Sequence, residues 1–207
     1  VRPAFRWTLF LVSSLGLYWY LSQGTGPLLV MMGVVGATFF LVRGMLLAGS
    51  ATKRKALLCL VVILNLGFLC AFKYIAFFRQ LGVSLGSVIP FDGQAAIAQI
   101  VSPLGLSFIS FKLISYAVDV YRGDAPPAPN GKVLLTYALF FPQVTAGPIQ
   151  RAKTFFHQLS QPVKFDFDNF TDGLKLILWG VFKKAVVADR MAVYVNQVFD
   201  HPADQSG

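Results

Sequence analysis

Four polar side chains share one side of the helix that the sequence predicts over residues 106–121. They are Lys112, Ser115, Tyr116 and Asp119. At about 100° per residue they fall within an arc of roughly 100°. A lysine and an aspartate on one stripe are costly against lipid, so this face is predicted to point towards protein or water.

Two interpretations of this polar face remain open. It is either the wall of a polar pocket or tunnel, or a hydrogen-bond network that locks neighbouring helices together. If the face is buried, Lys112 is expected to be the partner of Asp119, because an unpaired buried charge destabilises the fold strongly.

A second group of candidate residues lies in the apolar stretch 133–149. Proline and glycine interrupt this stretch, and proline removes a backbone donor and clashes with the preceding helical turn. Non-helical backbone at membrane depth is tolerated only where it is buried in protein or lines a cavity. We therefore predict a broken or re-entrant segment over residues 140–151. Its candidate tunnel or pocket residues are Pro142, Gln143, Gly147, Pro148 and Arg151.

The remaining polar residues give little sign of catalysis. His157 lies among charged neighbours and His201 lies beside Pro202 in a loose tail, whereas a general base must be held in a pocket. No spacing of His, Cys, Asp or Glu is typical of a metal site, so neither a metal nor a bound cofactor is expected. Asn65, alone in an apolar run, is interpreted as a contact between helices, with a ligand role as the alternative.

The composition indicates that lipid surrounds most of these elements. The AVILMFWYC residues make up 56% of the 207 residues and charged residues only 13%, about half the charged share that is usual in globular proteins. So few polar groups cannot cover a soluble surface, and we predict an integral membrane protein. The formal net charge of +9 is then explained by Lys and Arg at the ends of apolar runs. Nucleic acid is not an expected partner.

Three apolar runs precede the candidate residues. Residues 7–21 form a short run that ends in aromatic residues, and residues 28–48 and 56–78 are long enough to cross a bilayer. The densest basic cluster connects the two longer runs. By the positive-inside rule, residues 43–55 therefore face the cytoplasm and residues 79–94 face the other side.

The later elements are less regular. Residues 97–121 are long enough to span, but Pro103 and Gly105 predict a break or kink. Farther on, Thr171 is a candidate helix cap, and apolar side chains follow one stripe over residues 174–190. The uninterrupted apolar run there is too short to span a membrane, so an interfacial amphipathic helix is predicted. The predicted fold class is all-α: a polytopic integral membrane helical bundle with broken or re-entrant segments and an interfacial amphipathic helix.

Five segments, taken in order along the chain, resemble one protein family. They are Asn65-Leu-Gly-Phe-Leu-Cys-Ala-Phe-Lys73-Tyr74, Pro103-Leu-Gly105-Leu-Ser107-Phe-Ile-Ser-Phe111, Ser115-Tyr116-Ala-Val-Asp119-Val-Tyr121-Arg122-Gly123, Phe140-Phe-Pro142-Gln143-Val-Thr-Ala-Gly147-Pro148-Ile and Gly180-Val-Phe-Lys183-Lys184-Ala-Val-Val-Ala-Asp189. Together they resemble the membrane-bound O-acyltransferase family, above all the bacterial branch with the alginate O-acetyltransferases. The resemblance covers residues 56–199.

The resemblance implies an enzyme that transfers an acyl group, here acetyl, to hydroxyls of an exported polysaccharide such as alginate. Helices of this family surround a tunnel, the donor (acetyl-CoA or a carrier-bound acyl group) enters from the cytoplasmic side, and a histidine serves as the base. That histidine is expected downstream of Gly207. No catalytic residue is therefore expected in this chain, which alone should be inactive. Residues 1–207 are interpreted as part of a single acyltransferase domain, truncated at both ends.

The resemblance also implies a location and partners. We expect a multi-pass protein of the bacterial inner (cytoplasmic) membrane. Its expected partners are membrane lipid, the acyl donor, and a polysaccharide or a periplasmic acyl-accepting protein. The alternative is a non-catalytic membrane subunit or transporter half, in which Lys112 and Asp119 line a proton or solute pathway.

Overall fold

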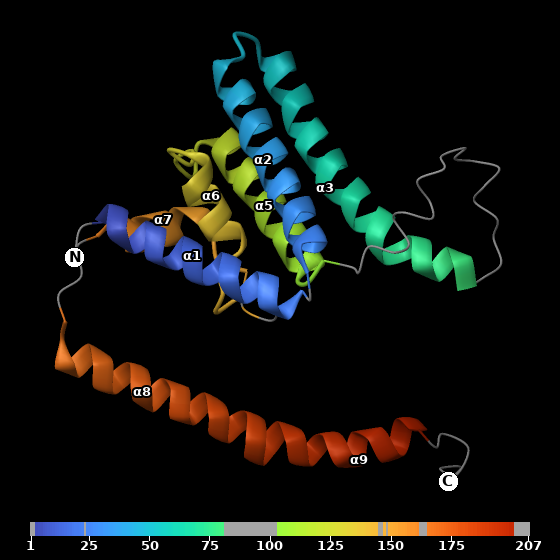
Figure 1. The fold of residues 1–207 in the computed structure, drawn as a ribbon, viewed down its shortest axis with the longest axis vertical. Coiled ribbons are helices and arrows are strands. Elements are labelled where there is room, and N and C mark those ends of the chain that lie inside the picture. Colours follow the sequence, from blue (N-terminus) through green and yellow to red (C-terminus); the bar gives the residue numbers. More distant parts are fainter. Residues whose placement is uncertain are drawn as a thin grey trace. The chain divides into compact units, whose positions relative to one another are not determined.

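All the secondary-structure elements of the described residues are helices (Figure 1). The computed structural model describes residues 3–22, 24–80, 103–144, 147, 149–161 and 165–200. They belong to two compact units, Val1–Pro162 and Val163–Gly207. The all-α prediction is confirmed for the residues described.

The first unit is built around three long helices that contact one another. Its helices are α1 (Pro3–Leu21), α2 (Thr25–Leu47), α3 (Ala51–Gln80), α5 (Leu106–Arg122), α6 (Gly131–Ala138) and α7 (Ala152–Ser160). Helices α2, α3 and α5 each contact the other two, and α2 also packs against α6. Helix α1 runs crosswise to α2 and contacts α6 and α7 (Figure 1).

Two helices of the described chain, Thr25–Leu47 and Ala51–Lys73, are long and apolar enough to cross a membrane. They correspond to the two longer runs predicted from the sequence. The basic residues expected in the connector instead lie in the first turns of α3. The hydroxyl of Ser50 accepts a hydrogen bond from the backbone N–H of Lys53 at 3.3 Å, so this cap starts the helix before the apolar run begins. Most of the predicted outer loop at 79–94 lies outside the described residues.

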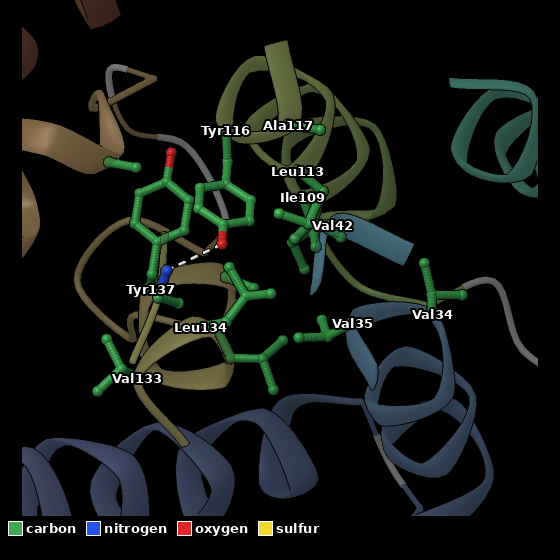
Figure 2. Close-up of a cluster of buried hydrophobic side chains, with 14 of the residues drawn as sticks. Val34, Val35, Val42, Ile109, Leu113, Tyr116, Ala117, Val133, Leu134 and Tyr137 are labelled. Atoms are coloured by element: carbon green, nitrogen blue, oxygen red, sulfur yellow. Dashed lines mark hydrogen bonds between the residues drawn. The ribbon is translucent and has the colours of Figure 1, made fainter. Parts of the chain in front are cut away.

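The core of the first unit lies where α2, α5 and α6 meet. Figure 2 shows apolar side chains of these helices facing one another: Val34, Val35, Val42, Ile109, Leu113, Ala117, Val133 and Leu134. The α5 members recur every four residues, which keeps them on one side of the helix. Their burial removes apolar surface from the surroundings and fixes which face of α5 points inward.

A polar contact also joins α2 and α3. Asn65 is fully buried, and its Nδ2 donates to the Thr38 hydroxyl at 3.2 Å and to the carbonyl of Val61 at 2.9 Å. Such an interhelical contact contributes about 1 kcal/mol. The predicted contact between helices is confirmed.

Glycines in the left-handed region delimit α5. Gly105 precedes it with φ +67° and Gly123 follows it with φ +82°. At the far end the N–H of Asp124 donates to the carbonyl of Asp119 at 2.8 Å, which satisfies a carbonyl that the helix leaves free. The break predicted near Pro103 and Gly105 is therefore the start of a helix, and residues 97–102 lie outside the described chain.

The second unit is a helix without a break. It comprises α8 (Phe167–Phe182), a π-helical turn η2 (Lys183–Ala188) and α9 (Asp189–Asp200). Its cap is Asp166, whose Oδ1 accepts from the N–H of Asp168 at 2.9 Å. The prediction of Thr171 as the cap is wrong, because its hydroxyl donates inside the helix to the carbonyl of Phe167 at 2.8 Å. Both residue types suit a cap, and the earlier one starts the helix.

The π turn changes which side chains meet. The N–H of Asp189 donates to the carbonyl of Lys184, and the Lys184 ammonium lies 3.0 Å from the Asp189 carboxylate. Five residues apart in an α-helix, these side chains would point about 140° away from each other. This helix extends beyond the 174–190 segment predicted from the sequence at both ends, and its place at a membrane interface stays a prediction.

Candidate functional site

The polar face of α5 points inward, as the sequence predicted. Lys112, Tyr116 and Asp119 are 3%, 1% and 6% exposed, and Ser115 is half-buried. Packing of the apolar residues on the same helix against α2 and α6 forces this orientation. Two interpretations of this face were open, a tunnel wall and a network between helices. The hydrogen bond of Lys112 and the ion pair of Asp119 are contacts between α5 and other elements, as a network requires.

Lys112 binds the end of α6. Its ammonium donates to the carbonyl of Tyr137 at 2.6 Å and lies 4.5 Å from the centre of the Tyr137 ring and 5.9 Å from that of Phe155. This carbonyl is one of the last in α6, which the helix itself leaves without a partner. A cation at a helix C-terminus is also favoured by the helix dipole, and the ring faces attract it further.

Asp119 pairs with Arg151. The Arg151 guanidinium lies 3.6 Å from the carboxylate, and the two side chains are 72% and 9% exposed. The predicted pairing of Asp119 with Lys112 is therefore wrong. Lys112 and Asp119 are two helical turns apart, about 10 Å along the axis of α5. Lys112 instead contacts the carbonyl of Tyr137, and Asp119 contacts Arg151.

Tyr137 is the residue that sequence reasoning missed. It is fully buried, and its hydroxyl donates to the carbonyl of Gln150 at 2.8 Å. Its ring lies beside that of Tyr116 (Figure 2), with 6.5 Å between ring centres, and 5.3 Å from that of Phe155. The hydroxyl of Tyr116 accepts from the N–H of Ala128 at 3.0 Å, drawn as the dashed line in Figure 2. Tyr137 lies in a short apolar helix, and nothing in the sequence around it distinguishes it from a tyrosine that only fills the core.

The break predicted over residues 140–151 is confirmed in its described part. Helix α6 ends at Ala138, turns follow to Val144, and α7 begins at Ala152. The turn contacts the start of α5 closely, because a Cβ on Gly105 would lie 2.1 Å from the carbonyl oxygen of Val144. Only glycine fits this approach. A re-entrant path through a membrane stays a prediction.

Glutamine amides line this segment. The Nε2 of Gln143 donates to the Oε1 of Gln150 at 3.2 Å, and the Nε2 of Gln150 donates to the Oε1 of Gln158 at 3.4 Å. The Oε1 of Gln143 is buried and has no hydrogen-bond partner among the described residues. A Cβ on Gly147 would lie 3.0 Å from the Gln143 side chain, so this glycine too is closely packed.

The other candidates lie apart from this network. Pro142 is exposed and Pro148 lies outside the described residues. His157 is exposed beside Gln161, with 3.2 Å between Nε2 atoms, and His201 also lies outside the described chain. Within the described ranges no three His, Cys, Asp or Glu side chains are grouped to hold a metal ion.

The arrangement is suited to binding and orientation. One face of α5 and described residues of the 140–151 segment are joined by two sets of polar contacts, the hydrogen bonds through Tyr137 and the Asp119–Arg151 ion pair. We call this group the α5 junction; it is made of Lys112, Asp119, Tyr137, Gln143, Gln150 and Arg151. Amides and a guanidinium bind hydroxyl and carbonyl groups well. None of these groups is arranged as a nucleophile with an adjacent base.

Comparison with known proteins supports one family. A protein of Pseudomonas aeruginosa described as a probable alginate O-acetylase is 32% identical over 178 residues, 83% of this chain and 33% of that protein. Its counterpart in Pseudomonas putida is 34% identical over 73% of this chain and 31% of that protein. A peptidoglycan O-acetyltransferase of Helicobacter pylori is 26% identical over 96% of this chain and 41% of its own length.

The chain spans about a third of the length of these Pseudomonas relatives. No protein-family model and no solved structure matches it. The relatives of 32–34% identity carry the same family description that the motifs in the sequence indicated. The chain belongs to the membrane-bound O-acyltransferase family, in the branch of the alginate O-acetylases.

Proposed function

We propose that this chain is part of a membrane enzyme that transfers an acetyl group to hydroxyls of an exported polysaccharide such as alginate. The observation that carries the proposal is the alignment with probable alginate O-acetylases over 83% of the chain. The peptidoglycan O-acetyltransferase relative supports a polysaccharide as the class of acceptor. The two long apolar helices agree with a multi-pass protein of the bacterial inner membrane.

The proposed reaction is an acyl transfer from acetyl-CoA or a carrier-bound acyl thioester. The acceptor hydroxyl oxygen attacks the carbonyl carbon, a new C–O bond forms and the C–S bond breaks. The hydroxyl proton passes to a base, and the sulfur leaves and takes up a proton. The proposed base is the family histidine, which the family resemblance puts later in the sequence than residues 56–199. Holding both substrates beside that base, away from water, supplies much of the rate enhancement.

In this proposal the α5 junction positions the substrates. Lys112 fixes the end of α6, Tyr137 fixes Gln150, and Asp119 holds Arg151 beside α5. The alternative of a transporter half has less support, because Lys112 and Asp119 contact different partners.

Polymer O-acetylation in the native host tests the proposal. Deletion of the gene is expected to remove acetyl esters from the exported polysaccharide, measured by proton NMR, and the wild-type gene is expected to restore them. Asp119→Asn should restore less than about a tenth of the acetyl content, because Arg151 is then no longer held in place to position a substrate. A tenfold loss of rate corresponds to about 1.4 kcal/mol of transition-state stabilisation, which is separate from any change in folding stability. Asp172→Asn is the matched control, because Asp172 forms an exposed pair with Lys175 in the second unit. A polymer with unchanged acetyl content after deletion would exclude the proposed function.

A further inference from the structure

The seam between α2 and α3 contains two hollows. One, of about 510 Å³, is walled by apolar and small side chains that include Gly33, Ala37, Leu64, Gly67 and Ala71. The other, of about 400 Å³, lies nearer the connection between the helices. Its walls include Gly44, Ala48, Lys53 and Leu57. Of the residues that line the two hollows, Lys53 in the second hollow is the one that carries a charge.

The two hollows open on one face of the α2–α3 hairpin. On α2 their walls recur at residues 33, 37, 44 and 48, and on α3 at residues 53, 57, 64, 67 and 71. Spacings of three, four and seven residues keep side chains on one side of a helix. The apolar hollow therefore lies along the same face as the hollow that contains Lys53.

The charge near this face is positive and unbalanced. Neither α2 nor α3 contains an acidic residue. Arg54 lies over the Tyr121 ring at 5.7 Å and Arg43 donates to the carbonyl of Pro129 at 3.2 Å, so both arginines contact the protein. Lys53 and Lys55 are exposed, and no salt bridge of either is found among the described residues.

The dimensions match one leaflet of a bilayer. Lys53 and Leu64 lie about 16 Å apart along α3, at about 1.5 Å per residue. Half of the hydrocarbon core of a bilayer is about 15 Å deep. An acyl chain that lies in the apolar hollow thus brings its phosphate to the level of Lys53.

We propose that this face of the α2–α3 hairpin binds one anionic phospholipid. An acyl chain occupies the hollow between Gly33 and Gly67, and the phosphate group of the headgroup binds Lys53. A lysine near an anionic headgroup contributes about 1 kcal/mol, or about a fivefold change in affinity. The inference requires these helices to lie in a membrane and does not require acyl transfer, so it can fail while the proposed function stands.

Lipid titration of the intact protein tests the headgroup contact. The protein, purified in detergent and stripped of lipid, is titrated with phosphatidylglycerol and with phosphatidylcholine of identical chains, and bound lipid is counted by native mass spectrometry. We expect about fivefold tighter binding of phosphatidylglycerol. Lys53→Gln should abolish this preference. Lys55→Gln, which removes an equal charge outside the hollow, should keep it.

A second pair of variants tests the chain contact. A Cβ on Gly67 or on Gly36 would meet nothing within 4 Å, so a larger side chain at either position starts in open space. Gly67→Leu fills the hollow and should weaken binding of both lipids, whereas Gly36→Leu, outside the hollow, should not. Equal affinity for the two lipids, or an equal loss with Lys55→Gln and Lys53→Gln, would overturn the proposal.

Discussion

The two units use opposite charges in different ways. In the first unit Asp119 and Arg151 lie far apart in sequence, and the pair joins α5 to the segment before α7 through a carboxylate that is only 9% exposed. In the second unit Asp172 and Lys175 lie one turn apart in α8 and are 71% and 70% exposed. Exposed pairs contribute little, whereas breaking a pair with a buried member leaves an uncompensated charge. The first pair therefore links separate elements, and the second does not.

The same contrast holds for apolar side chains. The first unit buries residues such as Leu113, Leu134 and Tyr137, whereas no described side chain of α8 or α9 is buried within its unit. Both units are rich in large apolar residues. Hydrophobicity alone therefore does not mark the site, and what distinguishes it is a group of polar side chains enclosed by packed helices.

The largest expected effect is that of Gly105→Ala. Alanine must adopt φ +67° and place its Cβ 2.1 Å from the Val144 carbonyl oxygen, so we expect a loss of more than about 3 kcal/mol of unfolding free energy. Gly123→Ala is the control, because it shares the positive φ but meets nothing within 4 Å, and should cost about 1–2 kcal/mol. Unfolding titrations in mixed detergent micelles measure both. If Gly105→Ala and Gly123→Ala lowered the unfolding free energy equally, the close approach of Gly105 to Val144 would not contribute to the loss.

A smaller and asymmetric effect is expected at the linking pair. Arg151→Met leaves the Asp119 carboxylate enclosed without its cation and should cost about 2 kcal/mol. Asp119→Asn keeps the shape of the side chain and leaves an arginine that is 72% exposed in contact with solvent, so its cost should stay below about 1 kcal/mol. The same titrations compare the two. A larger loss for Asp119→Asn would contradict the assignment of the aspartate as the buried member.

The smallest effect is expected in the second unit. Lys175→Ala removes one member of an exposed pair within α8 and should change the unfolding free energy by less than about 0.5 kcal/mol. The α-helical signal in circular dichroism, followed through thermal unfolding, detects any larger change. A loss comparable to that of Arg151→Met would remove the distinction between the units.

Local sequence signals predicted the elements better than their contacts. The period of α5 showed that its polar face points inward, and the prolines and glycines after residue 139 predicted the break. Asn65 stood out because it lies in an apolar run. Each of these signals depends on neighbours within one or two turns.

The partners of the site residues could not be predicted in the same way. Lys112 contacts a backbone carbonyl of α6, a group that every residue carries, and the glycine at 105 is required by a turn about 40 residues later. Asp166 and Thr171 were both acceptable caps for α8. The composition of the π turn does not reveal it, since lysine and alanine favour an α-helix and valine is common in one.

That π turn sets the rotational phase between α8 and α9. Deleting one residue from Lys183–Ala188 would restore ordinary α-helical winding and rotate every side chain beyond it by about 100° around the axis. The amino-acid content of α9 would stay the same, yet its exposed apolar residues would face another direction. The number of residues in this single turn, rather than their identity, determines which neighbour α9 can meet.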